Sequence, residues 1–194
     1  TALGGRYRLF EVRDGQRMIV ADPPLVQPLP HDVFREQVLT LYAGYRSTLP
    51  SHVVHLLDDH RFVDIALKVV GVGSVGTRAL MVLLAGRADL DPLFLQIKEA
   101  GSSVFEPWAA PATWASAGQR VVEGQRLLQA AGDLFLGWGS TGGRDYYLRQ
   151  LRDMKWSPDP SSLDARRLRR YARLCGHTLA RAHARSGDAI ALSA

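Results

Sequence analysis

A glycine-rich segment, Gly71-Val72-Gly73-Ser74-Val75-Gly76, is the first part of this sequence whose residue types and spacing could do chemistry. Glycine has no side chain, so the backbone N–H groups of such a segment can approach phosphate oxygens closely. Two classes of site use this spacing. A helix after the segment indicates a dinucleotide-binding unit, whereas a second antiparallel strand indicates a kinase-like lobe that holds ATP. A structural turn without any ligand is the third interpretation.

Lys98 is a candidate for the cation that a kinase-like lobe requires. The chain has three lysines against 21 arginines, so a lysine is informative here. It ends the string Leu95-Gln96-Ile97-Lys98, which has the form of the third-strand motif of such lobes, where the lysine pairs with phosphates and with a helix glutamate. Residues 119–131 have helical spacing and contain Glu123. We therefore expect the nucleotide-binding residues to be Gly71, Gly73, Ser74, Gly76, Lys98 and Glu123.

The dinucleotide-binding alternative requires a helix directly after the glycines, within residues 77–85. Glu99 would then be the acid that binds a ribose hydroxyl. It follows Gly71 by 28 residues, which is longer than the roughly 20 residues typical of that motif. The secondary structure of residues 77–85 therefore separates the two interpretations.

The elements that must position these residues can be predicted from patterning. Asp14-Gly15 lies between two short apolar stretches and is typical of a hairpin, and a proline-rich arm follows as far as Pro30. Helices are expected at residues 31–46, 51–59 and 163–185, and strands at residues 62–70, 77–85, 93–99, 134–138 and 146–151. We predict an α+β fold with a five-stranded antiparallel sheet and one packed helix. The hairpin and the first two helices are expected to pack around this lobe.

Five strings in the chain resemble the bacterial family catalogued as domain of unknown function 2252. They are Val70-Gly71-Val72-Gly73-Ser74-Val75-Gly76-Thr77-Arg78, Leu93-Phe94-Leu95-Gln96-Ile97-Lys98-Glu99-Ala100, Gln119-Arg120-Val121-Val122-Glu123-Gly124-Gln125-Arg126, Arg144-Asp145-Tyr146-Tyr147-Leu148-Arg149-Gln150-Leu151 and Leu179-Ala180-Arg181-Ala182-His183-Ala184-Arg185-Ser186-Gly187-Asp188. The family is grouped with the protein-kinase-like and aminoglycoside-phosphotransferase-like fold. The resemblance therefore implies this fold and a nucleotide site, but not a substrate, and it covers most of residues 60–190. We expect ATP and Mg²⁺ at that site, as in a phosphotransferase.

The acidic residues that phosphoryl transfer requires are not recognisable in this chain. The string nearest to a catalytic loop is His183-Ala184-Arg185-Ser186-Gly187-Asp188, which has no asparagine at the matching offset. The resemblance implies that acidic motifs of this kind lie N-terminal to the stretch seen here. Since the sequence starts at Thr1 without Met, we expect a nucleotide-binding part of a longer protein, with low turnover alone. The alternative from another class is a non-catalytic, pseudokinase-like interaction module.

A stripe of basic residues follows one face of the last predicted helix: Arg166, Arg170, Arg173, His177 and Arg181. Such a stripe could bind the phosphates of a nucleic acid. No aromatic residue is interleaved for base stacking, so we favour a solvated face of a core helix. Cys175 lies on the opposite, apolar face and is expected to be a buried structural thiol. The four tryptophans are expected to anchor the core or a hinge.

The chain of 194 residues is 46% hydrophobic and 22% charged, with a net charge of +5, which is typical of a globular protein. No apolar run approaches the roughly 18 residues that span a bilayer. A single cysteine makes a reducing cytoplasm the default location. We divide the chain into an N-terminal segment (1–61), a kinase-like nucleotide-binding lobe (62–156) and a helical segment (157–194). We assign no metal ligands, because the histidines His52, His55 and His60 lack a fixed second shell, and the acceptor substrate stays unnamed.

Overall fold

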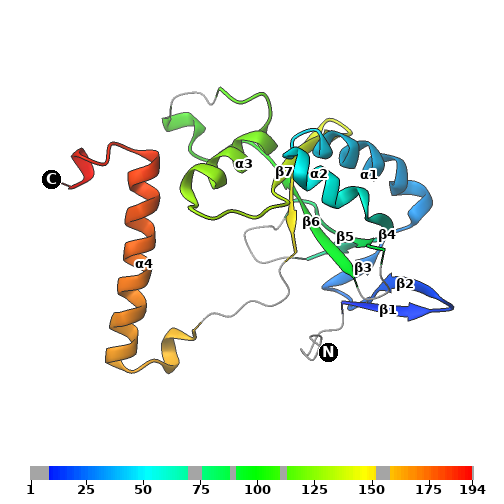
Figure 1. Cartoon of the computed structure of the whole chain (residues 1–194), viewed down its shortest axis with the longest axis horizontal. Coiled ribbons are helices and arrows are strands. Elements are labelled where there is room, and N and C mark those ends of the chain that lie inside the picture. The colour runs from blue at the N-terminus through cyan, green and yellow to red at the C-terminus, as the bar shows by residue number, and fades with distance from the viewer. Residues whose placement is uncertain (1–8, 70–75, 88–90, 110–112, 152–157, 194) are drawn as a thin grey trace. The chain divides into compact units, whose positions relative to one another are not determined.

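The computed structural model describes residues 9–69, 76–87, 91–109, 113–151 and 158–193 (Figure 1). The chain divides into two compact units, which are described separately. The first consists of residues 1–122 with 133–152, and the second of residues 123–132 with 153–194. The fold is a mixed α+β fold with antiparallel sheets, as predicted.

The chain begins with the predicted hairpin, formed by β1 (Phe10–Arg13) and β2 (Gln16–Ile19). Its two turn residues, Asp14 and Gly15, have φ values of 49° and 75°. A two-residue hairpin turn of this type requires positive φ at both positions, and Asp-Gly is among the pairs that tolerate it best. The Asp14-Gly15 signal therefore predicted this hairpin correctly.

In the described residues, the main sheet has six strands rather than the five predicted. They run in the order β3-β4-β5-β6-β8-β7, and every neighbouring pair is antiparallel. The strands are β3 (Val26–Pro28), β4 (Arg61–Lys68), β5 (Ala79–Ala85), β6 (Pro92–Ala100), β7 (Gly137–Thr141) and β8 (Arg144–Gln150). The additional strand, β3, comes from the proline-rich arm. Pro28 is compatible with it because β3 lies at the edge of the sheet, where a missing N–H is tolerated.

The hairpin of β7 and β8 begins later than predicted. Residues 134–138 were expected to be the strand and residues 139–143 the connection, whereas β7 continues to Thr141. Gly139 and Ser140 belong to the ladder, opposite Tyr146 and Asp145. The turn consists of Gly142 and Gly143 alone. The glycine-rich composition of residues 139–143 predicted a connection where three residues continue the strand.

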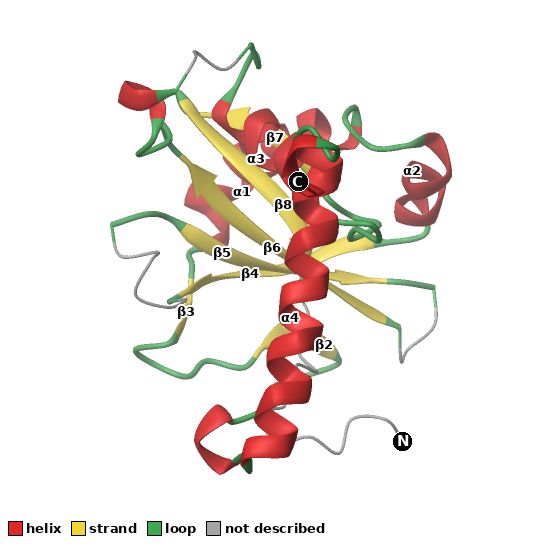
Figure 2. Ribbon diagram, turned by 90° about the vertical axis from the view of Figure 1, so that its left-hand side faces the viewer, coloured by secondary structure: helices red, strands yellow, loops and turns green. Residues whose placement is uncertain are grey.

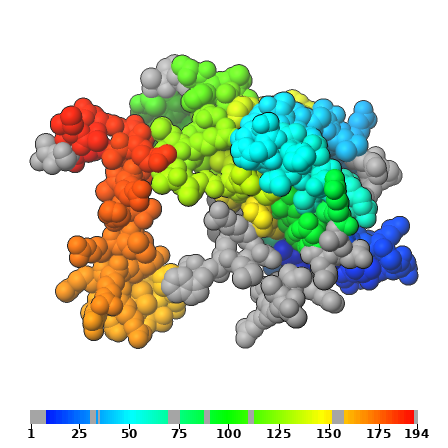
Figure 3. Space-filling view, in the orientation of Figure 1, coloured from blue at the N-terminus to red at the C-terminus, as the bar shows by residue number. Residues whose placement is uncertain are grey.

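Two helices, α1 (His31–Arg46) and α2 (Ser51–Asp58), pack against one face of the sheet (Figures 1 and 3). Their buried side chains form one core with those of the sheet: Val38, Leu41, Tyr45, Leu49, Val53 and Leu57 from the helices and adjoining turn, and Ile65, Val82, Leu84, Leu93, Leu95, Ile97, Tyr146 and Leu148 from the strands. The Tyr45 hydroxyl donates a hydrogen bond to the Phe135 carbonyl at 2.7 Å. This bond satisfies the one polar group of a fully buried ring.

A smaller core on the opposite face joins the N-terminal hairpin to the sheet. It consists of Ile19, Val26, Ala66, Met81, Leu83 and Phe94. Asp64 is buried beside it and accepts hydrogen bonds at 2.7 Å from the backbone N–H groups of Ile19 and Ile65. A buried carboxylate thus connects β2 to β4.

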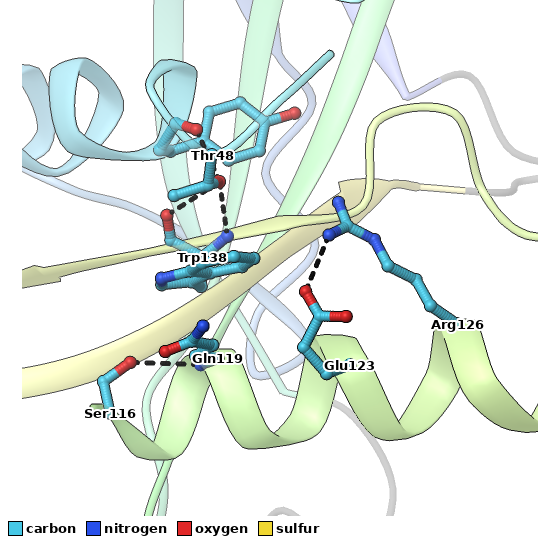
Figure 4. Close-up of polar contacts among 7 residues, drawn as sticks. Thr48, Ser116, Gln119, Glu123, Arg126 and Trp138 are labelled. Atoms are coloured by element: carbon cyan, nitrogen blue, oxygen red, sulfur yellow. Dashed lines mark hydrogen bonds and ion pairs between the residues drawn. The ribbon is translucent and has the colours of Figure 1, made fainter. Parts of the chain in front are cut away.

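The third helix of the fold, α3 (Ala117–Leu128), starts on the face opposite to α1 (Figure 4). A Cβ on Gly118 would lie 3.1 Å from the Trp138 Cβ and would overlap the Tyr146 carbonyl oxygen. Only glycine allows the backbone of α3 to approach β8 this closely. This contact fixes the first turns of α3 on the sheet.

The second unit contains α4 (Ala165–Ser186), the longest helix (Figure 2). The Asp164 carboxylate caps it by accepting a hydrogen bond from the Arg167 N–H at 2.7 Å. None of its side chains is buried within the described part of the chain, and the leucines of its apolar face are exposed.

The expectation that α4 is a core helix with a buried Cys175 is therefore wrong for the described residues, where Cys175 is exposed. The amphipathic pattern predicted the helix correctly, but it carries no information on what covers the apolar face. Two of the tryptophans expected to anchor the core or a hinge, Trp108 and Trp114, do not lie in the core, because 81% and 46% of their surface is accessible. Trp156 lies outside the described residues.

Candidate nucleotide site

The glycine-rich segment connects two neighbouring antiparallel strands. Gly71, Gly73 and Ser74 lie outside the described residues, whereas Gly76 is described and exposed, with φ of 84°. β4 ends at Lys68 and β5 begins at Ala79, and their register pairs Leu67 with Leu80. The segment is therefore the connection of a hairpin.

Residues 79–85 form a strand, which separates the two interpretations of the glycines. β5 lies between β4 and β6 and is antiparallel to both. A dinucleotide-binding unit instead requires parallel strands joined by a helix, so that expectation is wrong for this segment. The sequence alone did not distinguish a strand from a helix at β5, because β5 is buried on both faces. A buried strand is a continuous apolar run, Ala79–Ala85 here, with no alternation to distinguish it from a helix.

Lys98 lies near the C-terminal end of β6, directly opposite Ala79, the first residue of β5. It is half-buried. On its other side it pairs with Tyr147 of β8, which in turn pairs with Trp138 of β7. Residues that are directly opposite share one face of a sheet, so these three side chains form a row across the strands. The row starts beside the end of the glycine-rich hairpin.

The row lies on the face of the sheet to which α3 is attached. Gly118 packs against Trp138, the last member of the row. Trp138 is held by Thr48, whose hydroxyl oxygen accepts a hydrogen bond from the backbone N–H of Trp138 at 3.1 Å (Figure 4). Burial raises the pKa of the Tyr147 hydroxyl above its usual value, against a smaller lowering by Arg149. Tyr147 therefore stays a neutral hydrogen-bonding group beside Lys98.

Glu123 lies on α3 and is half-buried. Its carboxylate accepts a hydrogen bond from the Arg126 guanidinium at 2.9 Å, one turn further along the same helix (Figure 4). This pair was not predicted, although the spacing of three residues is typical of ion pairs on a helix. The expected pairing of Glu123 with Lys98 stays a prediction.

Glu99, the expected ribose-binding acid of the dinucleotide alternative, has another role. Its carboxylate accepts hydrogen bonds from the Arg144 guanidinium at 2.6 Å and from the Arg78 backbone N–H at 3.2 Å. Burial raises the pKa of Glu99, but these hydrogen bonds and the positive charges of Arg144 and Arg78 outweigh it, so the pKa lies below its ordinary value. Glu99 thus joins the end of the glycine-rich hairpin to the β7–β8 turn. This link depends on which residues of β6 and its neighbouring strands lie opposite each other, and a spacing motif contains no such information.

The histidines His52, His55 and His60 do not form a metal-binding cluster within the described residues. Within the ranges that the structure describes, no three His, Cys, Asp or Glu side chains gather into a set that could hold a metal ion. His60 instead contacts the Leu56 carbonyl oxygen at 2.9 Å through its Nδ1 atom.

The comparisons with known proteins identify a family and no individual relative. A family model described as "Uncharacterized protein conserved in bacteria (DUF2252)" matches residues 6–194. No curated protein and no solved structure matches the chain. None of the helices in the described ranges is both long enough and apolar enough to cross a bilayer.

Proposed function

We propose that this chain, which belongs to the uncharacterised bacterial family DUF2252, is the ATP-binding part of a kinase-like phosphotransferase. The observation that carries the proposal is the strand at residues 79–85. It makes the glycine-rich segment a hairpin connection between antiparallel strands, which is how such segments cover ATP phosphates in kinase-like lobes.

The sequence of elements after this hairpin supports the same proposal. Lys98 lies on the strand after β5, one helix follows with Glu123, and two paired strands close the sheet. In a kinase-like lobe the lysine neutralises phosphate charge, and the helix glutamate holds the lysine in place. Lys98 and Glu123 are the residues of this chain proposed for these two roles. Magnesium would be bound together with ATP and would neutralise the charge that develops on the phosphates.

A non-catalytic, pseudokinase-like interaction module is the second candidate function. The exposed basic stripe of α4, with Arg166, Arg170, Arg173 and Arg181, favours it, as does the missing asparagine after Asp188. Binding of nucleotide without transfer of phosphate would fit this candidate. Binding of nucleic acid through the basic stripe would also be a non-catalytic interaction of this kind.

Calorimetric titration of the full chain with ATP, ADP and NAD, in the presence of Mg²⁺, tests the proposal. We expect ATP and ADP to bind and NAD not to bind. Lys98→Ala removes a charged hydrogen bond of about 1.5–3 kcal/mol, so it is expected to weaken ATP binding roughly tenfold to a hundredfold. Arg87→Ala is the matched control, because Arg87 is an exposed cation at the opposite end of β5. Binding of NAD in preference to ATP, or equal losses in both variants, would overturn the proposal.

A further inference from the structure

An open pocket of about 540 Å³ lies beside the first turn of α3, and its lining includes neither Lys98 nor Gly76. Its volume is within the range of small-molecule sites in proteins. The side chains that could interact with a ligand there come from three segments that are separate in sequence. They are Ser102, Glu106, Trp114, Ser116, Arg120 and Asp145.

The pocket contains charges of both signs, and each keeps free hydrogen-bonding capacity. Arg120 donates one N–H to the Gly101 carbonyl at 2.7 Å, which occupies a single one of its five N–H groups. Glu106 accepts one hydrogen bond, from the Ser103 N–H to its Oε1 atom at 2.8 Å. No ion pair between Arg120 and a carboxylate is found among the described residues. A guanidinium and a carboxylate therefore line one cavity without neutralising each other.

Asp145 contributes a second carboxylate to the lining of the pocket, and two hydrogen-bond donors hold this carboxylate in place. Its Oδ2 atom accepts a hydrogen bond from the Ala117 N–H at 2.8 Å, and its Oδ1 atom accepts one from the Ser140 hydroxyl at 2.7 Å. The first bond caps α3 at its N-terminus. Asp145 is therefore a fixed negative charge rather than a mobile one.

Trp114 gives the pocket an apolar wall. Trp114 is 46% exposed, although a residue of this size gains most from burial. An exposed aromatic side chain on the rim of a polar cavity is typical of binding sites. The ligand that suits this wall carries an apolar or aromatic group.

We propose that this pocket binds a small zwitterion with an apolar or aromatic side chain, of the α-amino acid class. The ammonium group would pair with Glu106, the carboxylate with Arg120 and the Ser116 hydroxyl, and the side chain would cover Trp114. A simple anion would be repelled by the two carboxylates, and a simple cation would be repelled by the guanidinium. Either ligand would also leave a charged group of the pocket without a partner. The proposal does not depend on nucleotide binding, because the pocket contains none of the residues proposed for ATP.

Three probes that share one ring test this assignment. Phenylalanine is the zwitterion, phenethylamine lacks the carboxylate, and 3-phenylpropionate lacks the ammonium group. We expect calorimetry on the full chain to show saturable binding of phenylalanine at least tenfold tighter than that of either analogue. The indole N–H signal of Trp114, assigned in NMR spectra by its loss in Trp114→Phe, is expected to shift with phenylalanine.

Two variants separate the charges. Arg120→Gln is expected to weaken phenylalanine at least tenfold while leaving phenethylamine unchanged. Glu106→Gln, on an exposed turn, keeps the oxygen that accepts from Ser103 and is expected to weaken phenylalanine while leaving 3-phenylpropionate unchanged. Arg87→Gln serves as the control for loss of one exposed positive charge. Absence of phenylalanine binding, equal binding of an analogue, or equal losses in Arg87→Gln and Arg120→Gln would overturn the proposal.

Discussion

At the scale of single residues, Glu99 shows how one carboxylate connects three parts of the sheet. It lies on β6 and binds Arg78 before β5 and Arg144 at the start of β8. All three positions adjoin the end of the sheet from which the glycine-rich hairpin emerges. Glu99 thus stabilises the frame of the proposed nucleotide site without being a proposed ligand of the nucleotide.

We predict that Glu99→Gln lowers the free energy of unfolding at pH 7 but not in acid. The pKa of Glu99 is lower in the folded chain than its ordinary value of 4.5. Its charge therefore stabilises the fold above pH 4.5, and this contribution is lost as the pH falls through the lower, folded-state pKa. Urea unfolding of both proteins across this pH range measures the difference. A difference in the free energy of unfolding between the two proteins that is the same at low and neutral pH would contradict the stabilising role of the Glu99 charge.

Asp64 is the second residue whose role could not be deduced from its position in the sequence. We predict that Asp64→Ala destabilises the fold by about 1–3 kcal/mol, since the buried N–H of Ile19 loses its acceptor. Hydrogen exchange of the Ile19 amide is expected to accelerate, because β2 loses its link to β4. Asp91→Ala, at a carboxylate that is 63% exposed, is the control. Equal unfolding free energies in the two variants would contradict the prediction.

At the scale of elements, the attachment of α3 to the sheet depends on the close approach at Gly118. We predict that Gly118→Ala destabilises the fold by about 1–3 kcal/mol, because the added methyl group would overlap β8. Gly124→Ala is a matched control in the same helix, where a Cβ meets nothing within 4 Å. It is expected to stabilise the helix by up to about 1 kcal/mol. Thermal unfolding of the two variants checks the opposite signs, and equal signs would count against this packing.

Most elements could be predicted from the sequence because their signals are local. The Asp14-Gly15 turn and the helices after Pro30 and Pro50 are examples, and the structure has them at the expected positions. β3 could not be predicted, because three residues of a proline-rich arm become a strand only when β4 is beside them. The exposure of Cys175 could not be predicted either, because burial depends on whether another surface covers the helix, and the helix sequence does not determine this.

The candidate site was predictable only in part, for a related reason. Spacing motifs identified the glycines and Lys98, and the strand at residues 79–85 sets Lys98 beside the end of the hairpin. The pair of Glu123 with Arg126 and the links made by Glu99 depend on side-chain geometry and register. Neither register nor geometry can be read from the order of residues alone.

At the scale of the whole molecule, one antiparallel sheet carries the hairpin, Lys98 and the contact with α3. We propose that the hairpin of residues 69–78 and the end of β6 bind the phosphates of ATP. The pocket beside α3 is a separate prediction with its own ligand. A measurement that reports on both regions at once can therefore distinguish the two.

Hydrogen exchange of the full chain, with and without Mg²⁺ and ATP, is that measurement. We predict that ATP slows exchange of the amides in residues 69–78 and around Lys98, and that this protection is lost in Lys98→Ala. Protection confined to residues 113–120, beside the α3 pocket, or no protection at all, would contradict the claim that the glycine-rich hairpin binds ATP.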